Sequence, residues 1–136
     1  MVFEEVRQGI AVVDIPLEKV WTAAKEADPN SQDWEHIDDL SRRFPWRIRL
    51  RRGIATEASV TISASPSVDG ESRLTMLIRI DLEPLSGEAV EAVRRFLTDA
   101  YVRDQITSLG AKWEGAYEGM LRRSLAEPGA NAGQTL

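Results

Sequence analysis

The stretch Ile10-Ala-Val-Val-Asp-Ile-Pro-Leu-Glu-Lys-Val-Trp21 predicts a β-strand that passes directly into an amphipathic helix. Apolar residues before Pro16 fall on both faces of an extended chain, which indicates a strand deep in the structure. Pro16 cannot donate to a sheet ladder, but it suits the first turn of a helix. Asp14 is expected to accept hydrogen bonds from the free N–H groups of that turn.

Composition places the chain among ordinary globular domains. At 136 residues it is expected to form one domain over 1–126, followed by a disordered tail over 127–136 that has no periodicity. The absence of cysteine excludes disulfides and thiolate sites, and a net charge of −5 argues against nucleic acid as a partner. We expect a cytoplasmic protein without membrane insertion, because no apolar run is long enough to span a bilayer.

The middle of the chain alternates between helix and strand patterns. Trp34, Ile37 and Leu40 recur at helical spacing, which predicts a short second helix capped by Asp33. Strict alternation then predicts strands over 46–51, 57–64 and 74–82, the last two joined by a hairpin turn over 66–70.

A long helix is expected from Ser86, its N-cap, to about Arg123. Its apolar stripe slips near 103–105, and Gly110 predicts a bend.

The order of these elements resembles the START-like superfamily, also called helix-grip or SRPBCC, which includes polyketide cyclase and lipid-transport proteins. The stretch 10–21 is similar to the family's opening strand, proline and helix, and 72–84 with the long helix is similar to its last strand and gripping helix. The resemblance implies an α+β fold in which a curved antiparallel sheet grips the long C-terminal helix, with two short helices after the first strand. Residues 46–84 leave room for three or four strands, fewer than relatives usually have.

The resemblance implies that a small hydrophobic ligand, such as a lipid or polyketide, binds between the sheet and the C-terminal helix without dedicated catalysis. Such pockets are lined mostly by apolar and aromatic side chains, with few polar groups to orient the ligand. The candidate ligand-binding residues are Trp34, Trp46, Ile78, Arg49, Phe96, Tyr101 and Asp104. The alternative for the tryptophans is core packing, and Arg79 is a conceivable partner for Asp104.

Two other functions stay open. A polyketide cyclase-like enzyme would use Arg49, Tyr101 and Asp104. A protein-interaction module would present the arginines between Arg42 and Arg52 to an acidic partner, because guanidinium groups bind carboxylates in a bidentate way. If Trp46, Ile48 and Leu50 face the helix, the arginines between them face solvent.

No cofactor, metal site or catalytic constellation is expected. His36 is the single histidine, and its spacing to neighbouring acidic residues fits no standard metal motif. A solvent-facing position is expected for it, and the chain is expected to be a monomer or homodimer.

Overall fold

A computed structural model describes residues 4–49, 55–83 and 85–126. The elements are β1 (Glu4–Val13), α1 (Leu17–Ala27), the 3-10 turn η1 (Ser31–Asp33), β2 (Glu35–Asp38), β3 (Ser41–Arg49), β4 (Ala55–Pro66), β5 (Ser72–Asp81), α2 (Gly87–Phe96) and α3 (Asp99–Ala126). The expectations for residues 50–53, for Pro84 and for the tail over 127–136 lie outside the described residues.

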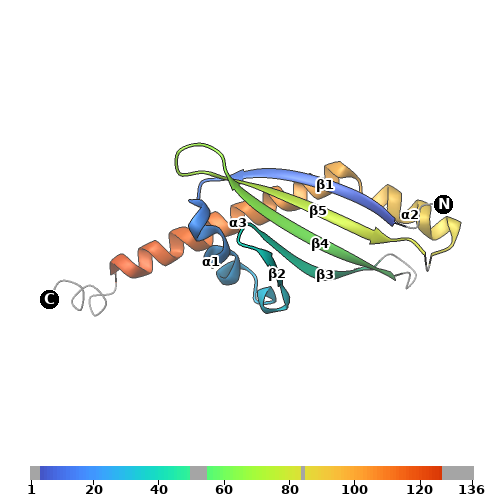
Figure 1. The fold of residues 1–136 in the computed structure, drawn as a ribbon, viewed down its shortest axis with the longest axis horizontal. Helices are drawn as coiled ribbons and strands as arrows, with labels where there is room; N and C mark the ends of the chain where they lie inside the picture. The colour runs from blue at the N-terminus through green and yellow to red at the C-terminus, as the bar shows by residue number, and fades with distance from the viewer. Residues whose placement is uncertain (1–3, 50–54, 84, 127–136) are drawn as a thin grey trace.

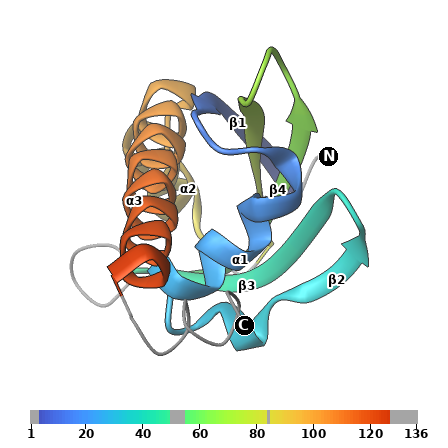
Figure 2. The ribbon, with the colours of Figure 1, turned by 90° about the vertical axis from the view of Figure 1, so that its left-hand side faces the viewer.

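The five strands form one antiparallel sheet in the order β1-β5-β4-β3-β2. α3 runs along one face of this sheet, and its C-terminal turns extend beyond the strands (Figure 1). α1 lies between α3 and the β2–β3 end of the sheet (Figure 2). The α+β fold expected from the sequence, a curved antiparallel sheet against a long C-terminal helix, is confirmed.

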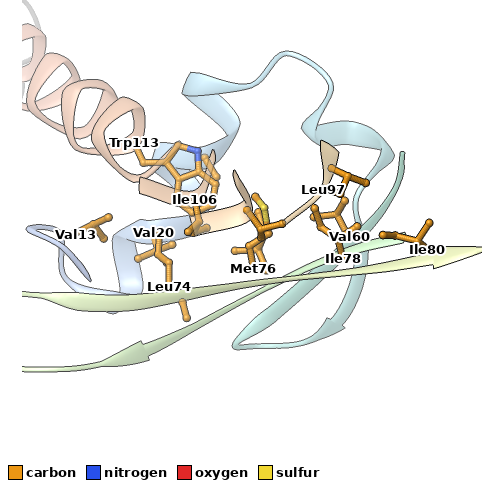
Figure 3. Packing of buried hydrophobic residues seen from close by; sticks show 14 of the residues in the cluster. Val13, Val20, Val60, Leu74, Met76, Ile78, Ile80, Leu97, Ile106 and Trp113 are labelled. Carbon is orange, nitrogen blue, oxygen red and sulfur yellow. The ribbon is translucent and has the colours of Figure 1, made fainter. Parts of the chain in front are cut away.

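The core lies between α3 and the face of the sheet that we call the inner face. Alternate residues of β5 point into it and are buried, namely Leu74, Met76, Ile78 and Ile80. Trp113 and Ile106 reach from α3 toward this layer (Figure 3). The predicted β4–β5 hairpin is confirmed, and Gly70 closes its turn with a φ of 74°, which favours glycine.

The first strand does not lie deep in the structure, because β1 is an edge strand. Val6, Ile10 and Val12 are exposed on the outer face of the sheet, and Val13 is buried on the inner face. Small residues on the inner face let α3 approach closely: a Cβ added to Gly9 would lie 2.6 Å from backbone atoms of α3. The apolar residues on both faces of this stretch therefore belong to an edge strand with one exposed face, and they do not indicate burial of both faces.

Two side chains of α3 accept backbone hydrogen bonds, one from β1 and one from the residue just after it. The backbone N–H of Gln8 donates to the carboxylate of Asp99 at 3.4 Å, and that of Asp14 donates to Glu114 at 2.6 Å. The expectation that Asp14 caps α1 is wrong, since the N-cap residue is Pro16 and no side chain caps that helix. Buried Ser72 instead fixes the entry to α1, because its hydroxyl donates to the Ile15 carbonyl at 2.6 Å.

The segment predicted as a second helix over Trp34–Leu40 forms β2 and a turn, and the short helix η1 precedes it. The Asp38 carboxylate accepts the N–H of Leu40 at 2.8 Å, which fixes a turn into β3. Ile37 and Leu40 are exposed, so their helical spacing does not mark a buried stripe.

The helix predicted from Ser86 to about Arg123 is two helices. Ser86 caps α2 as expected, accepting the N–H of Ala89 at 3.4 Å. The chain then breaks at Leu97, and Thr98 caps α3 by accepting the N–H of Tyr101 at 3.1 Å. α3 continues through 103–105 and through Gly110 without a further break.

A candidate ligand-binding groove

A groove of about 700 Å³ opens between α1, η1 and the β2–β3 end of the sheet. We call it the indole groove because two tryptophans form its walls. Its lining residues are Trp21, Thr22, Ala24, Lys25, Glu26, Ser31, Gln32, Trp34, His36 and Arg42. The volume lies within the range of small-molecule sites in proteins.

The two tryptophans of this groove belong to a cluster of four aromatic rings. Trp34 stacks on Phe44 with ring centroids 5.0 Å apart and an interplanar angle of 11°. The Trp21 ring meets Trp34 edge-on at 6.2 Å, and Trp113 lies 6.1 Å from Trp21 and 6.0 Å from Trp34. Such arrangements stabilise the cluster beyond the area that each ring buries.

Trp34 also borders a second groove, of about 240 Å³, which is lined by Asp28, Asn30, Asp33, Trp34, Phe44, Pro45 and Trp46. The Trp34 side chain therefore stands between two open spaces. Trp34 is therefore a lining residue of both grooves.

The β2–β3 wall of the indole groove holds a cation in a fixed place. The Arg42 guanidinium carbon lies 4.8 Å from the ring centroid of Trp21. The Trp21 indole N–H donates to the Asp39 carbonyl at 2.9 Å, which ties α1 to the turn after β2. Arginine over a tryptophan face is a favourable cation–π arrangement.

Trp113 contributes a buried donor to the aromatic cluster. Its side chain is fully buried, and its Nε1 has no hydrogen-bond partner among the described residues. A buried donor without an acceptor costs about 1–3 kcal/mol.

The structure brings two of the seven candidate residues to these grooves, Trp34 and Trp46. Ile78 is a core residue and is 1% exposed. Phe96 and Tyr101 pack together at the α2–α3 break with ring centroids 4.9 Å apart, and Phe96 is exposed.

The two charged candidates face solvent. Arg49 is exposed on the outer face, since its neighbour Ile48 is buried on the inner face. Asp104 is exposed on α3, between the buried residues Val102 and Ile106. Arg79 is not the partner of Asp104, because it lies on the outer face and pairs with Glu4 at 3.5 Å.

The arginines of β3 divide between the two faces of the sheet. Arg43, Arg47 and Arg49 are exposed on the outer face, as expected if Trp46 and Ile48 face inward. Arg43 pairs with Glu35 at 3.3 Å, and Arg47 pairs with Glu57 at 3.9 Å. Arg42 alone among the described arginines of this strand lies on the inner face, half-buried, in the indole groove.

Sequence reasoning did not place Lys25 and Arg42 in the indole groove or Phe44 in the second groove. Phe44 and Arg42 are separated from Trp46 and Ile48 by even numbers of residues, so all four lie on the same face of β3. A predicted strand that began at Ser41 would have placed Phe44 and Arg42 on the inner face. His36 faces solvent as expected, although it lies on β2 opposite Arg42 and lines the groove.

The described residues hold no group of three or more histidine and acidic side chains able to bind a metal ion. None of the helices in the described ranges has the length and hydropathy to cross a membrane.

The sheet order, the helix α1 after the first strand and the long C-terminal helix define a helix-grip fold. The protein TTHA0849 from Thermus thermophilus has a similar structure, with a TM-score of 0.53 and 14% identity over 82% of this chain and 99% of that chain. At this identity the likeness shows the fold. No protein-family model and no curated protein matches the chain in sequence.

Two further solved structures are similar at lower scores. The di-domain ARO/CYC StfQ from the steffimycin biosynthetic pathway has a TM-score of 0.43 and 12% identity, over 88% of this chain and 52% of that chain. The lipid transfer and protein localization domain of human StarD13 (DLC2) has a TM-score of 0.37 and 16% identity, over 82% and 76% respectively.

Proposed function

We propose that the protein binds a small hydrophobic molecule in the indole groove, without dedicated catalysis. The observation that carries this proposal is the groove of about 700 Å³ walled by Trp21 and Trp34. Indole rings offer large, rigid contact area at a low cost in conformational entropy. The sequence suggested a ligand between the sheet and α3, but Ile106, Leu97 and Met76 fill the described centre of that space. We therefore propose the α1 end of the sheet as the binding site.

Binding without chemistry is supported by the positions of the residues considered for a cyclase. Arg49 is exposed on the outer face of the sheet, whereas Tyr101 packs on Phe96 at the α2–α3 break. Asp104 is exposed on α3. General acid–base catalysis needs such groups within hydrogen-bond reach of one substrate.

The experiment is a titration of the full chain with Nile red, a neutral probe whose fluorescence rises in apolar surroundings. We expect saturable binding to the wild type and its loss in Thr22→Trp, which fills the groove from its exposed rim. The matched control is Thr107→Trp, exposed on α3 outside the groove lining. Absence of saturable binding, or equal binding by the Thr22→Trp variant, would contradict the proposal.

A second candidate is contact with an acidic protein through the outer face of β3. The exposure of Arg43, Arg47 and Arg49 on one face favours it. Binding of a poly-glutamate peptide to the wild type and to an Arg47→Glu, Arg49→Glu variant tests this idea. Equal affinity of the two proteins would remove it.

A further inference from the structure

The Arg42 guanidinium in the indole groove is held in place by hydrogen bonds to the protein's own backbone. Arg42 Nη1 donates to the Asp38 carbonyl at 2.6 Å and to the Ser41 carbonyl at 3.0 Å. Both of its hydrogen bonds within the described residues use Nη1, which leaves Nε and Nη2 as donors. A guanidinium that is already held in place loses little conformational freedom when it binds an anion.

The charge of the groove is positive, although the chain as a whole carries −5. Lys25 is exposed on α1 and lines the groove together with Arg42. Glu26 is the one acidic residue among the lining residues, and its carboxylate pairs with Arg123 at 3.6 Å. Its negative charge is therefore partly offset, and the groove favours an anion.

Apolar and positive surfaces meet within this one groove. Trp34 and Ala24 supply apolar wall, and Trp21 carries the Arg42 guanidinium over its ring. A ligand that fits both surfaces has an apolar body and an anionic end.

We infer that the ligand is an amphipathic carboxylate, with its apolar body against the indoles and its carboxylate bound by Arg42 near Lys25. The Nε–Nη2 edge of a guanidinium matches the two oxygens of a carboxylate in a bidentate pair. This inference rests on the proposed function, because it names the class of molecule that the same groove takes.

The experiment compares two ligands that share one apolar body, 1-pyrenebutyrate and 1-pyrenebutanol, by titration of the full chain. We expect the carboxylate to bind about tenfold tighter at low salt, because a charge-assisted hydrogen bond is replaced by a neutral one in the alcohol. Added sodium chloride is expected to shrink this difference, since salt screens exposed charges.

Single-residue variants test the contribution of the positive charges to binding separately from that of the apolar walls. Lys25→Gln and Arg42→Gln are expected to weaken carboxylate binding several-fold more than they weaken alcohol binding. Arg42→Lys keeps the charge but loses the bidentate edge, so an intermediate affinity is expected. Lys19→Gln is the matched control, because Lys19 is exposed on the same helix and does not line the groove.

Equal affinity for the two pyrene ligands overturns the inference and leaves the proposed function standing. Unchanged carboxylate binding in both Lys25→Gln and Arg42→Gln overturns it as well. If neither ligand binds saturably, the proposed function itself fails.

Discussion

Val13 of the edge strand and Gly110 of α3 meet where the helix crosses the sheet, and their contact leaves no room for a methyl group. A Cβ added to Gly110 would lie 2.6 Å from Val13 Cγ1. Val13 is buried, and its branched side chain has few alternative rotamers. The distance between α3 and β1 therefore depends on this glycine.

Gly110→Ala is expected to destabilise the protein by about 1–3 kcal/mol, the usual cost of overpacking a core. Helix propensity alone predicts the opposite sign, a gain of about 1 kcal/mol. Urea unfolding followed by circular dichroism measures the difference. Gly115→Ala is the matched control, because a Cβ there meets nothing within 4 Å, and it is expected to stabilise. The double variant Val13→Ala, Gly110→Ala should lose less stability than the sum of the losses in the two single variants. Additive losses in the free energy of unfolding would show that Val13 and Gly110 are not in contact.

Arg7 holds the break between α2 and α3. Its Nε donates to the Leu97 carbonyl at 2.5 Å, and its Nη2 pairs with Glu5 at 2.7 Å. Arg94 also donates to Glu5 and to Glu91, and these two hydrogen bonds hold the pKa of Arg94 above its usual value. Arg7→Met is expected to cost about 1.5–3 kcal/mol, the range for hydrogen bonds to charged groups.

The Arg7 measurement needs a control on a neighbouring strand. Arg73→Met on β5 changes an exposed arginine of the outer face and is expected to stay within about 0.5 kcal/mol of the wild type. Equal unfolding free energies for the two variants would show that Arg7 does not hold the helix break.

Ser72 is buried, and its hydroxyl donates to the Ile15 carbonyl just before α1. Ser72→Ala leaves that carbonyl without its side-chain donor, so we expect a loss of about 1–3 kcal/mol in the free energy of unfolding. Ser65→Ala, at an exposed position of β4, is the control. A cost no larger than that of the control would mean that the Ile15 carbonyl has another donor.

The stack of Trp34 on Phe44 can be measured with a double-mutant cycle of Trp34→Ala and Phe44→Ala. We expect a coupling free energy of about 0.5–1.5 kcal/mol, typical of aromatic pairs. Thermal unfolding of the four proteins supplies the cycle. Additive costs would show that the two rings contribute independently.

Periodicity predicted the sheet well where one face is buried. β5 alternates buried residues with half-buried or exposed ones along its whole length, and its predicted hairpin partner is β4. β2 could not be predicted this way, because all four of its residues are exposed and no buried face imposes a period.

The sequence contains a helix-start signal at the break between α2 and α3, but the prediction followed the apolar stripe, which continues across the break. Thr98 followed by Asp99 is an N-cap with an acidic first turn, a recognised start of a helix. The stripe from Val93 continues past it through Val102, so hydrophobic spacing alone joined two helices into one.

The candidate site could be predicted only in part, because the groove is formed by segments that lie far apart in the sequence. Trp34 and Trp46 were candidate pocket residues because aromatic side chains line such sites, with core packing as the alternative. The groove itself depends on α1 lying against the β2–β3 end, which brings Lys25 to the same space as Arg42. Contacts between such distant segments have no local signature.

The two carboxylates that α3 places along β1 have a consequence for aggregation. A ten-residue edge strand with exposed Val6, Ile10 and Val12 is a template on which another chain can add. Asp99 accepts the N–H of Gln8 on this strand, and Glu114 accepts that of Asp14 just after its end, only while α3 is docked. Detachment of the C-terminal helix therefore uncovers the core and unblocks the strand in one event, so partial unfolding and self-association are linked.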